Sequence, residues 1–175
     1  MTAKEFANKI ANSRQDFIEE FFSLLKKEKV RFCLIGGLAV NVYAEPVVSL
    51  DVDIVVVAAK IDSFVKLIKR KFKVAELKHS INIGAASSDV RIQIQKDERY
   101  QAFIKGARVK KVIGYSLPAA RIEDVLRGKI WAYSDKTRRQ SKRQKDLADI
   151  MRLVEVKPEL IEYLPAAVKG KLNDF

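Results

Sequence analysis

The chain has 175 residues, 48% of them hydrophobic, which is enough to bury the core of one compact domain. Its 34 Lys and Arg against 22 Asp and Glu give a formal net charge of +12, which favours polyanionic partners such as RNA, DNA or nucleotide phosphates. Alternatively, the positive charge makes the surface basic and soluble without indicating any partner. No apolar run approaches the roughly 20 residues of a membrane span, and charges interrupt the N-terminal segment, so we expect no membrane association and a cytoplasmic protein.

Cysteine and histidine are too scarce for several kinds of site. Cys33 is the only cysteine and lies in the apolar run VRFCLI, which excludes an internal disulfide and a cysteine-based zinc cluster and predicts a buried structural thiol. His79 is the only histidine, which rules out most His-rich metal sites. The chain shows no Ser/His/Asp triad, Cys/His pair or zinc-ligand spacing.

The first segments predict a helix, a strand and a second helix. Ser13, with Asp16 three residues later, is typical of a helix start. The helix that follows carries apolar side chains on one stripe: Phe17, Phe21, Leu24 and Leu25. Residues 30–35 predict a short buried strand that Gly36 and Gly37 end. The next segment, LAVNVYAE, is typical of a short helix that ends before Pro46.

Further strands dominate the middle of the chain. We expect strands over 50–57, 72–77, 81–83 and 89–95, an edge strand over 111–117, and helices over 61–71 and 100–104. The segment DVRIQIQ alternates strictly, so its apolar side chains share one face and its polar ones the other: Val90, Ile92 and Ile94 against Asp89, Arg91, Gln93 and Gln95.

After Pro118 the pattern is helical to the end. One helix carries a stripe made of Ile122, Val125, Leu126, Lys129, Ile130 and Tyr133, and a second is expected over 141–154. This order of elements predicts an α+β (α/β-like) fold, in which a small mixed sheet is flanked by helices and followed by a helical C-terminal part. We expect one domain over 1–175, with a core over about 30–117 and C-terminal helices over about 118–175.

Two carboxylates, Asp51 and Asp53, open the strongest predicted strand. Alternate side chains of a strand share a face, so both point the same way from Cα atoms about 6–7 Å apart. Such a pair can bind one or two cations of the kind used in phosphoryl transfer, because Mg²⁺ prefers few carboxylates and completes its shell with water and phosphate. The simpler alternative is a turn and a solvated strand end.

Gly36 and Gly37 make that interpretation more specific. They stand where a buried strand turns into a helix, so amides at the helix start are free to donate to an anion. Residues without a Cβ also let a phosphate approach the backbone closely. A glycine pair alone is common in tight turns, but a glycine pair followed by a strand that opens with two aspartates favours a phosphate-and-metal site.

At this point the sequence resembles a known family. The stretch LIGGLAVNVYAEPVVSLDVDIVV, read as hhGGxAxxxY…SxDxDhhh, resembles the core of the polymerase-β-like minimal nucleotidyltransferases. The later segments EDVLRGKIWA and RRQSKRQKDLADIMRL resemble the C-terminal part of the nucleotidyltransferase toxins of type IV toxin–antitoxin and abortive-infection systems. In those toxins a helix bearing a lysine precedes a helix with an R…KDxxDhxxL motif. The resemblance spans roughly residues 30–153.

The resemblance implies a nucleotidyltransferase fold and an activity. Such a protein would use Mg²⁺ or Mn²⁺ to move a nucleoside monophosphate from an NTP to an RNA (tRNA-like) or protein acceptor, and it would have a small antitoxin protein as partner. It also implies a role for matching residues: Gly36 and Gly37 hold the triphosphate, Asp51 and Asp53 bind the metal, Ser49 lies at the nucleotide, Lys129 contacts phosphate, and Asp146 is the acid of the KD pair.

The residues themselves support two of these roles. Lys129 lies on an apolar stripe, where a lysine needs a reason to face inward, and Asp146 flanks the buried face of the next helix. A snorkelling lysine and a surface ion pair are the alternatives. The basic run before Asp146 would contact the acceptor or its phosphates, unless it is only a solvated helix end: Arg138, Arg139, Lys142 and Arg143.

One departure from the family concerns a third carboxylate. Many members carry it on a later strand that faces the first two, but the mid-strand positions here are Arg91 and Gln93. Asp89 lies on the same face at the start of the strand, so either it is the third metal ligand or the site has only two. A nucleotidyltransferase fold that binds nucleotide or nucleic acid without turnover is therefore one alternative function. A small-molecule nucleotidyltransferase is another, although a basic surface disfavours the cationic acceptors of the aminoglycoside-modifying type.

Overall fold

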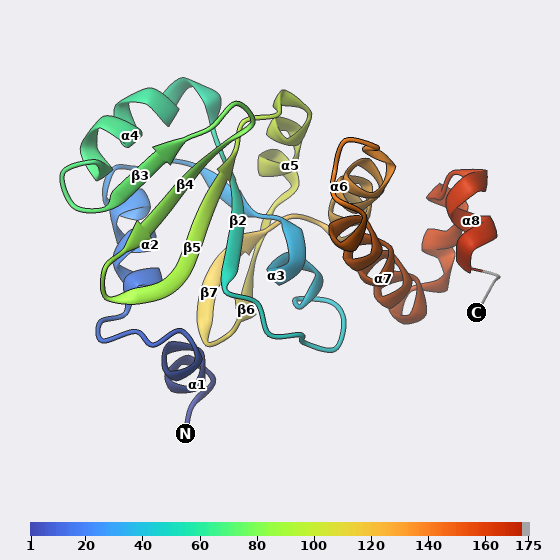
Figure 1. Ribbon diagram of the computed structural model, residues 1–175, viewed down its shortest axis with the longest axis horizontal. Helices are drawn as coiled ribbons and strands as arrows, with labels where there is room; N and C mark the ends of the chain where they lie inside the picture. Colours follow the sequence, from blue (N-terminus) through green and yellow to red (C-terminus); the bar gives the residue numbers. More distant parts are fainter. Residues whose placement is uncertain (173–175) are drawn as a thin grey trace.

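A single mixed sheet organises the protein (Figure 1). The computed structural model describes residues 1–172, and within them seven strands follow the order β3-β4-β5-β2-β1-β7-β6. The strands are β1 (Phe32–Leu34), β2 (Asp51–Val56), β3 (Lys73–Glu76), β4 (Ser80–Ala85), β5 (Ser88–Gln95), β6 (Arg108–Val112) and β7 (Tyr115–Ala119). β2 is parallel to β5 and β1 to β7, while the other neighbouring pairs are antiparallel. The α+β class with a mixed sheet is confirmed.

Helices surround this sheet and continue beyond it. They are α1 (Ala3–Ile10), α2 (Phe17–Lys27), α3 (Gly36–Val40), α4 (Ile61–Ile68), α5 (Gln101–Gly106), α6 (Ile122–Ser134), α7 (Gln140–Val156) and α8 (Ala166–Leu172). In Figure 1, α6, α7 and α8 extend to one side of the sheet as the expected helical C-terminal part. Positions 173–175 of that part lie outside the described residues. None of the helices described is both long and apolar enough to cross a membrane.

One hydrophobic core joins α2 and α4 to the sheet. Edge-on aromatic contacts connect α2 to α4 and to the segment after it, with ring centroids 5.7 Å apart for Phe21 and Phe64 and 5.3 Å apart for Phe17 and Phe72. The inward-facing side chains of the strands complete the layer, as the alternation of DVRIQIQ predicts: Val90, Ile92 and Ile94 are buried while Asp89 and Arg91 are exposed. The buried face fixes the register of β5 and so decides which residues the opposite face presents.

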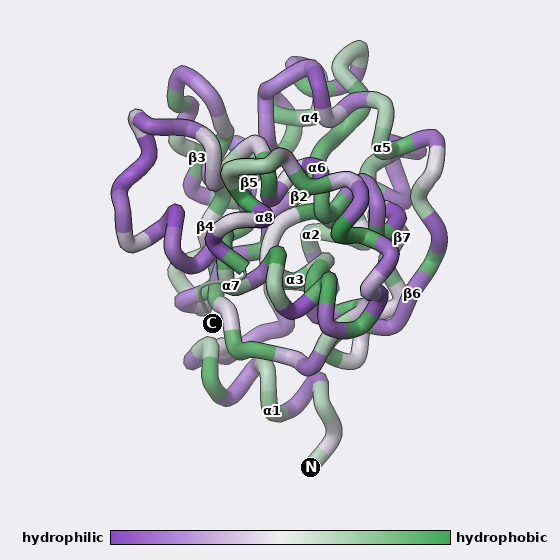
Figure 2. Tube along the Cα trace, turned by 90° about the vertical axis from the view of Figure 1, so that its right-hand side faces the viewer, coloured by the Kyte–Doolittle hydropathy of each residue, from purple (hydrophilic) through white to green (hydrophobic). Residues whose placement is uncertain are grey.

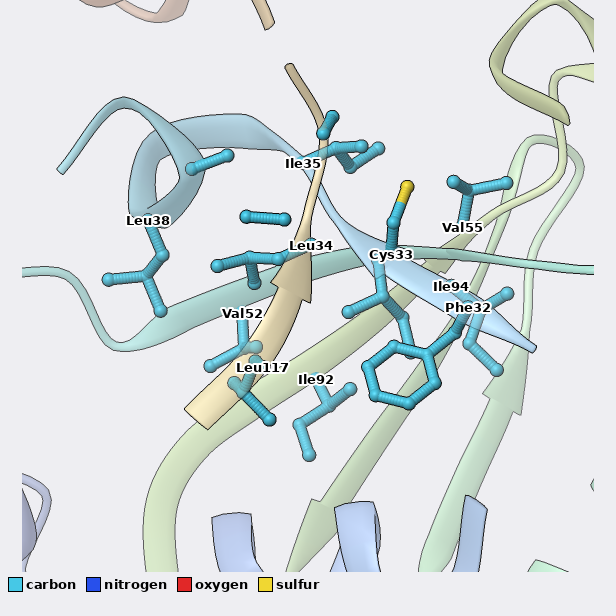
Figure 3. Close-up of a cluster of buried hydrophobic side chains, with 14 of the residues drawn as sticks. Phe32, Cys33, Leu34, Ile35, Leu38, Val52, Val55, Ile92, Ile94 and Leu117 are labelled. Carbon is cyan, nitrogen blue, oxygen red and sulfur yellow. The ribbon is translucent and has the colours of Figure 1, made fainter. Parts of the chain in front are cut away.

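Cys33 is buried on the opposite face of the sheet from Phe32 and Ile92, as Figure 3 shows. Its side chain packs among those of β1, β2 and their neighbours and is fully buried. Burial raises the pKa of the thiol to about 12, and the nearby Asp124 carboxylate adds to this effect. The prediction of an inert structural thiol is confirmed.

The N-terminal segment differs from the expectation. α2 begins at Phe17 with Asp16 as its cap, because the Asp16 carboxylate accepts a hydrogen bond of 2.9 Å from the Glu19 amide. Ser13, expected as the cap, instead places its hydroxyl 2.5 Å from that of Ser88 on β5. An additional helix, α1, precedes it with its own Thr2 capping box. A contact across 75 positions, between Ser13 and Ser88, therefore overrides the local capping signal.

The expected edge strand over 111–117 is wrong, because the segment forms a hairpin. β6 and β7 turn at Ile113 and Gly114, which both have positive φ, 43° and 84°. β7 is an inner strand that pairs with β1, and Pro118 lies within it rather than ending the sheet. β6 is the edge strand, and its largely hydrophilic trace (Figure 2) carries Arg108, Lys110 and Lys111, charges of the kind that keep an edge from pairing with other chains.

Candidate active site

β2 presents two carboxylates to one pocket. Its alternation buries Val52 and Ile54 and leaves Asp51 and Asp53 partly exposed on the opposite face, so the two aspartates share a face as expected. The pocket they line has a volume of about 160 Å³. It also receives side chains or backbone from five further segments, represented by Gly37, Ser49, Gln93, Lys129 and Asp146. Residues more than 90 positions apart thus converge on one cavity.

The Asp53 side chain lies so close to the backbone of residue 36 that only a glycine fits there. The Gly36 φ of +67° is unfavourable for residues with a side chain, and a Cβ at this position would lie 2.8 Å from the Asp53 Cβ and collide with its carboxylate. At Gly37 a Cβ would meet nothing within 4 Å. The two glycines therefore have different roles: Gly36 lets the carboxylate lie against the backbone, and Gly37 leaves open space at the start of α3 beside the pocket.

Asp53 is an unneutralised carboxylate in a low-dielectric position. Burial raises its pKa, Lys129 opposes that effect, and Asp51 adds to it. The Arg138 and Arg91 charges also lower the pKa, but the net shift is upward. Within the described residues the Asp53 carboxylate makes no hydrogen bond or ion pair. It is therefore suited to bind a cation supplied from outside the chain.

Asp51 has a partner that the sequence does not reveal. Arg91 on β5 lies directly opposite Asp51 in the sheet, and its Nε and Nη2 atoms lie 3.0 and 2.8 Å from Asp51 Oδ1. Asp89, the candidate third ligand, accepts a hydrogen bond of 2.6 Å from the Asn12 amide instead. No three acidic, His or Cys side chains in the part of the chain described here are grouped to hold one metal ion, so Asp89 does not join Asp51 and Asp53.

Ser49 is held at the edge of the same pocket. Its hydroxyl donates to the Asp51 carbonyl and accepts from the Asp51 amide, each at 3.2 Å. This local turn fixes the chain just before the first carboxylate. Ser49 therefore positions the backbone of Asp51 in addition to lining the pocket.

Lys129 is buried between two aspartates of α7. Its Nζ lies 2.9 Å from Asp146 Oδ1 and 2.7 Å from Asp149 Oδ2, and all three residues are less than 9% exposed. Lys129 faces inward and Asp146 is beside it, so the structure brings together two of the expected residues. Asp149 was not among them. The spacing in KDLAD was a signal for it, because residues three apart share a helix face.

The charges around Lys129 decide its protonation. Burial alone would lower the lysine pKa, but the Asp149 and Asp146 carboxylates outweigh burial and raise it above 10.5. Each aspartate also has an arginine: Arg138 Nε lies 2.9 Å from Asp146 Oδ2, and Arg152 Nη1 lies 2.7 Å from Asp149 Oδ1. The lysine is therefore a fixed cation, and two of its three donors are already engaged.

The basic run before Asp146 divides into two groups. Arg138 lines the pocket, together with Lys142 and Lys145, of which Lys145 was not expected. Arg143 turns away, because its Nε donates to the Tyr133 carbonyl at 2.7 Å and its guanidinium lies over the Tyr133 ring. Arg139 precedes α7 and is absent from the residues that line the pocket. Only one of the three arginines expected at the acceptor thus faces the site.

A smaller adjoining pocket of about 90 Å³ extends the site toward α5. It shares Asp53, Lys129, Arg138 and Asp146 with the first and adds Tyr100, Phe103 and Asp124. Trp131 stacks on Phe103 with ring centroids 5.7 Å apart, so it is a packing residue. Asp124 is buried and paired with Arg127 at 3.2 Å; its position became evident only from the fold.

Comparisons with known proteins identify the fold. No protein-family model matches the chain, and no curated protein matches it in sequence. A solved structure of ANT(2'')-Ia with adenylyl-2''-tobramycin is 14% identical with a TM-score of 0.62, covering 89% of this chain and 96% of that one. An antigenic nucleotidyltransferase-like protein from Paracoccidioides brasiliensis is 16% identical with a TM-score of 0.60, covering 99% and 88%. A solution structure of ANT(2'')-Ia, an antibiotic-resistance factor, is 9% identical with a TM-score of 0.58, covering 90% and 89%. The chain thus has the nucleotidyltransferase fold.

The two glycines provide a matched pair of variants. We expect Gly36→Ala to lower the free energy of unfolding by about 2 kcal/mol, because it combines positive-φ strain with the collision against Asp53. Gly37→Ala should change it by less than about 1 kcal/mol, since alanine suits a helix and meets no atom. Urea denaturation measures both, and equal losses would contradict the assigned roles.

Asp53 should destabilise the metal-free protein. The folded-state pKa of Asp53 lies above the ordinary value of 3.8, so folding favours the protonated carboxyl. The protein is therefore most stable with respect to this group below pH 3.8, and it loses that stability as the pH rises through the folded-state pKa and the buried carboxylate becomes charged. We expect Asp53→Asn to raise the free energy of unfolding by roughly 1 kcal/mol at pH 7, and by less toward pH 4. Thermal unfolding in EDTA at both pH values measures this gain. Asp51→Asn, which breaks an ion pair, serves as the control and should not stabilise.

Removal of the buried lysine should cost much more. Lys129→Met leaves the carboxylates of Asp146 and Asp149 buried with one arginine each, and we expect a loss of about 3 kcal/mol. Lys145→Met, on the same side of the pocket but exposed, should change stability by about 0.5 kcal/mol or less. Chemical denaturation compares the two, and similar values would show that the Lys129 ion pairs contribute little.

Proposed function

We propose that this protein is a nucleotidyltransferase that moves a nucleoside monophosphate from an NTP to an acceptor hydroxyl. The observation that carries the proposal is the shared pocket. On a nucleotidyltransferase fold, the carboxylates of Asp51 and Asp53 face the same cavity as the buried Lys129–Asp146 pair. Four of the residues assigned by the family resemblance therefore lie where one nucleotide can contact them.

The donor set fits Mg²⁺ or Mn²⁺. Asp51 and Asp53 project from a rigid strand, and Asp53 has no competing partner in the described residues. Mg²⁺ binds in proteins through one or two carboxylates and leaves room for phosphate oxygens. When bound, the ion would supply positive charge to the triphosphate and polarise its reacting phosphoryl group.

The protein's own groups would orient the nucleotide around this point. The open backbone at Gly37 gives a phosphate room to approach, and Ser49 borders the same space. Lys129 keeps a third N–H donor for a phosphate oxygen while the two aspartates fix its position. Arg138, Lys142 and Lys145 line the pocket and would offset the charge that develops during transfer.

An RNA acceptor is favoured over a small molecule. The formal charge of +12 and the basic wall of the pocket suit a phosphate chain and disfavour cationic acceptors. Because the C-terminal segments resemble those of nucleotidyltransferase toxins, we propose a tRNA-like RNA or a protein as the acceptor. The same resemblance suggests that the protein acts as a toxin and has an antitoxin protein as its partner. We also propose that residues 1–175 form one nucleotidyltransferase domain.

A non-catalytic nucleotide-binding module is the second candidate. It is favoured by one observation, the ion pair in which Arg91 occupies an oxygen of Asp51. In such a protein the pocket would bind NTP or nucleic acid without transfer. Binding in the absence of any transferred label distinguishes this candidate from the first.

Incubation with each α-³²P-labelled NTP, Mg²⁺, total RNA and a protein extract tests the proposal. We expect label in RNA or protein, and Asp51→Ala and Asp53→Ala should each lower the transfer rate by on the order of 10²-fold or more. Asp62→Ala, at an exposed position of α4, is the matched control and should retain the rate. Transfer that is equal in all four proteins, or label in none of the acceptors, would refute the enzymatic function. Label found only on an added aminoglycoside would assign a small-molecule acceptor.

A further inference from the structure

The register of the sheet places a cation where a third carboxylate was expected. β2 and β5 are parallel neighbours, and their Cα partners include Asp51 with Arg91 and Asp53 with Gln93. Side chains of paired residues leave a sheet on the same face. The two β5 positions beside the β2 carboxylates therefore carry a guanidinium and a neutral amide.

From this arrangement, and resting on the function proposed above, we infer that the site holds one divalent cation instead of two. Arg91 takes the place of the third metal-binding carboxylate. Its guanidinium supplies, as a fixed charge, the positive charge that a second divalent ion would bring. Arg91 is thus a positioning residue that acts through Asp51.

The contacts of Arg91 are specific to one oxygen. Nε and Nη2 lie 3.0 and 2.8 Å from Asp51 Oδ1, so Oδ2 takes no part in this ion pair. A guanidinium does not lose its proton at any ordinary pH. Asp51 therefore keeps one carboxylate oxygen for a metal ion it shares with Asp53, while the side toward β5 is permanently cationic.

No other described group can complete a second metal site. Asp89, the remaining carboxylate on this face of β5, is bound to the Asn12 amide at 2.6 Å, and no three acidic, His or Cys side chains within residues 1–172 gather at one point. Gln93 offers a neutral oxygen that adds no charge. Asp146 also lines the pocket, but its two carboxylate oxygens are taken by Lys129 and Arg138, each at 2.9 Å. The remaining charged side chains there are cations, which suit a triphosphate and repel a second metal ion: Lys129, Arg138, Lys142 and Lys145.

Counting bound metal ions tests this inference directly. Mn²⁺ binding is measured from the electron paramagnetic resonance signal of the free ion, with non-hydrolysable α,β-methylene analogues of the four NTPs present and absent. With nucleotide present we expect one Mn²⁺ per chain bound by the wild-type site and two by Arg91→Asp; without nucleotide the wild type should bind no more than one. Arg91→Gln should still bind one, on the order of tenfold more tightly, because the repelling charge is gone and Asp51 is released.

Arg108→Gln is the matched control, because Arg108 is an exposed arginine on β6 whose contacts are to backbone carbonyls. It should bind Mn²⁺ as the wild type does. The Arg91 side chain is 48% exposed, so its variants should fold, and thermal unfolding verifies this. Two ions in the wild type, one ion in Arg91→Asp, or unchanged affinity in Arg91→Gln would each overturn the inference.

The outcomes also separate this inference from the proposed function. Transfer of nucleotide label by a wild type that binds two ions would remove the single-metal inference and leave the enzymatic function intact. If Asp51→Asn/Asp53→Asn binds Mn²⁺ as well as the wild type, the metal lies elsewhere and both proposals fail. A wild type that binds one ion and nucleotide but transfers nothing would support Arg91 as the cation and assign a binding module.

Discussion

The geometry of the site depends on the buried ion pairs of Lys129 with Asp146 and Asp149 on α7. They join α6 to α7 through a buried charge, and the connection continues from Asp149 to Arg152. Arg152 donates in turn to Asn41 at 2.9 Å and to the Glu45 carbonyl. Asn41 holds the Val47 backbone through both atoms of its amide, just before the strand that carries the carboxylates. A polar chain thus connects the C-terminal helices to the entry of β2, and removal of Lys129 from it leaves two buried carboxylates with one arginine each.

Local patterns in the sequence account for much of this architecture. The alternation in DVDIVV and DVRIQIQ was enough to place Asp51 and Asp53 on a polar face, and the glycine pair marked the turn into α3. These features depend on a few neighbouring residues, so a single sequence reveals them. The hairpin of β6 and β7 was missed because Ile113 takes a positive φ that its residue type disfavours.

Long-range pairing is what the sequence could not show. The opposition of Arg91 to Asp51 depends on the register of two strands 40 positions apart, and the hydrogen bond of Asn12 to Asp89 depends on where the N-terminal segment packs. Arg138 and Arg143 belong to the same basic run, yet Arg138 donates to the Asp146 carboxylate and Arg143 donates to the Tyr133 carbonyl. Helix periodicity does not distinguish them, because Arg138 lies in the turn before α7 and only Arg143 lies within the helix.

The buried thiol has a practical consequence. Cys33 is the only cysteine in the chain, it is fully buried, and its pKa of about 12 leaves almost no thiolate at neutral pH. The protein is therefore almost silent toward maleimide and other thiol-directed dyes. A single cysteine introduced on an exposed turn of α7 or on β6 would carry a fluorophore or spin label at that point alone. Movement of the helical part against the sheet could then be followed without first removing a native cysteine from the core.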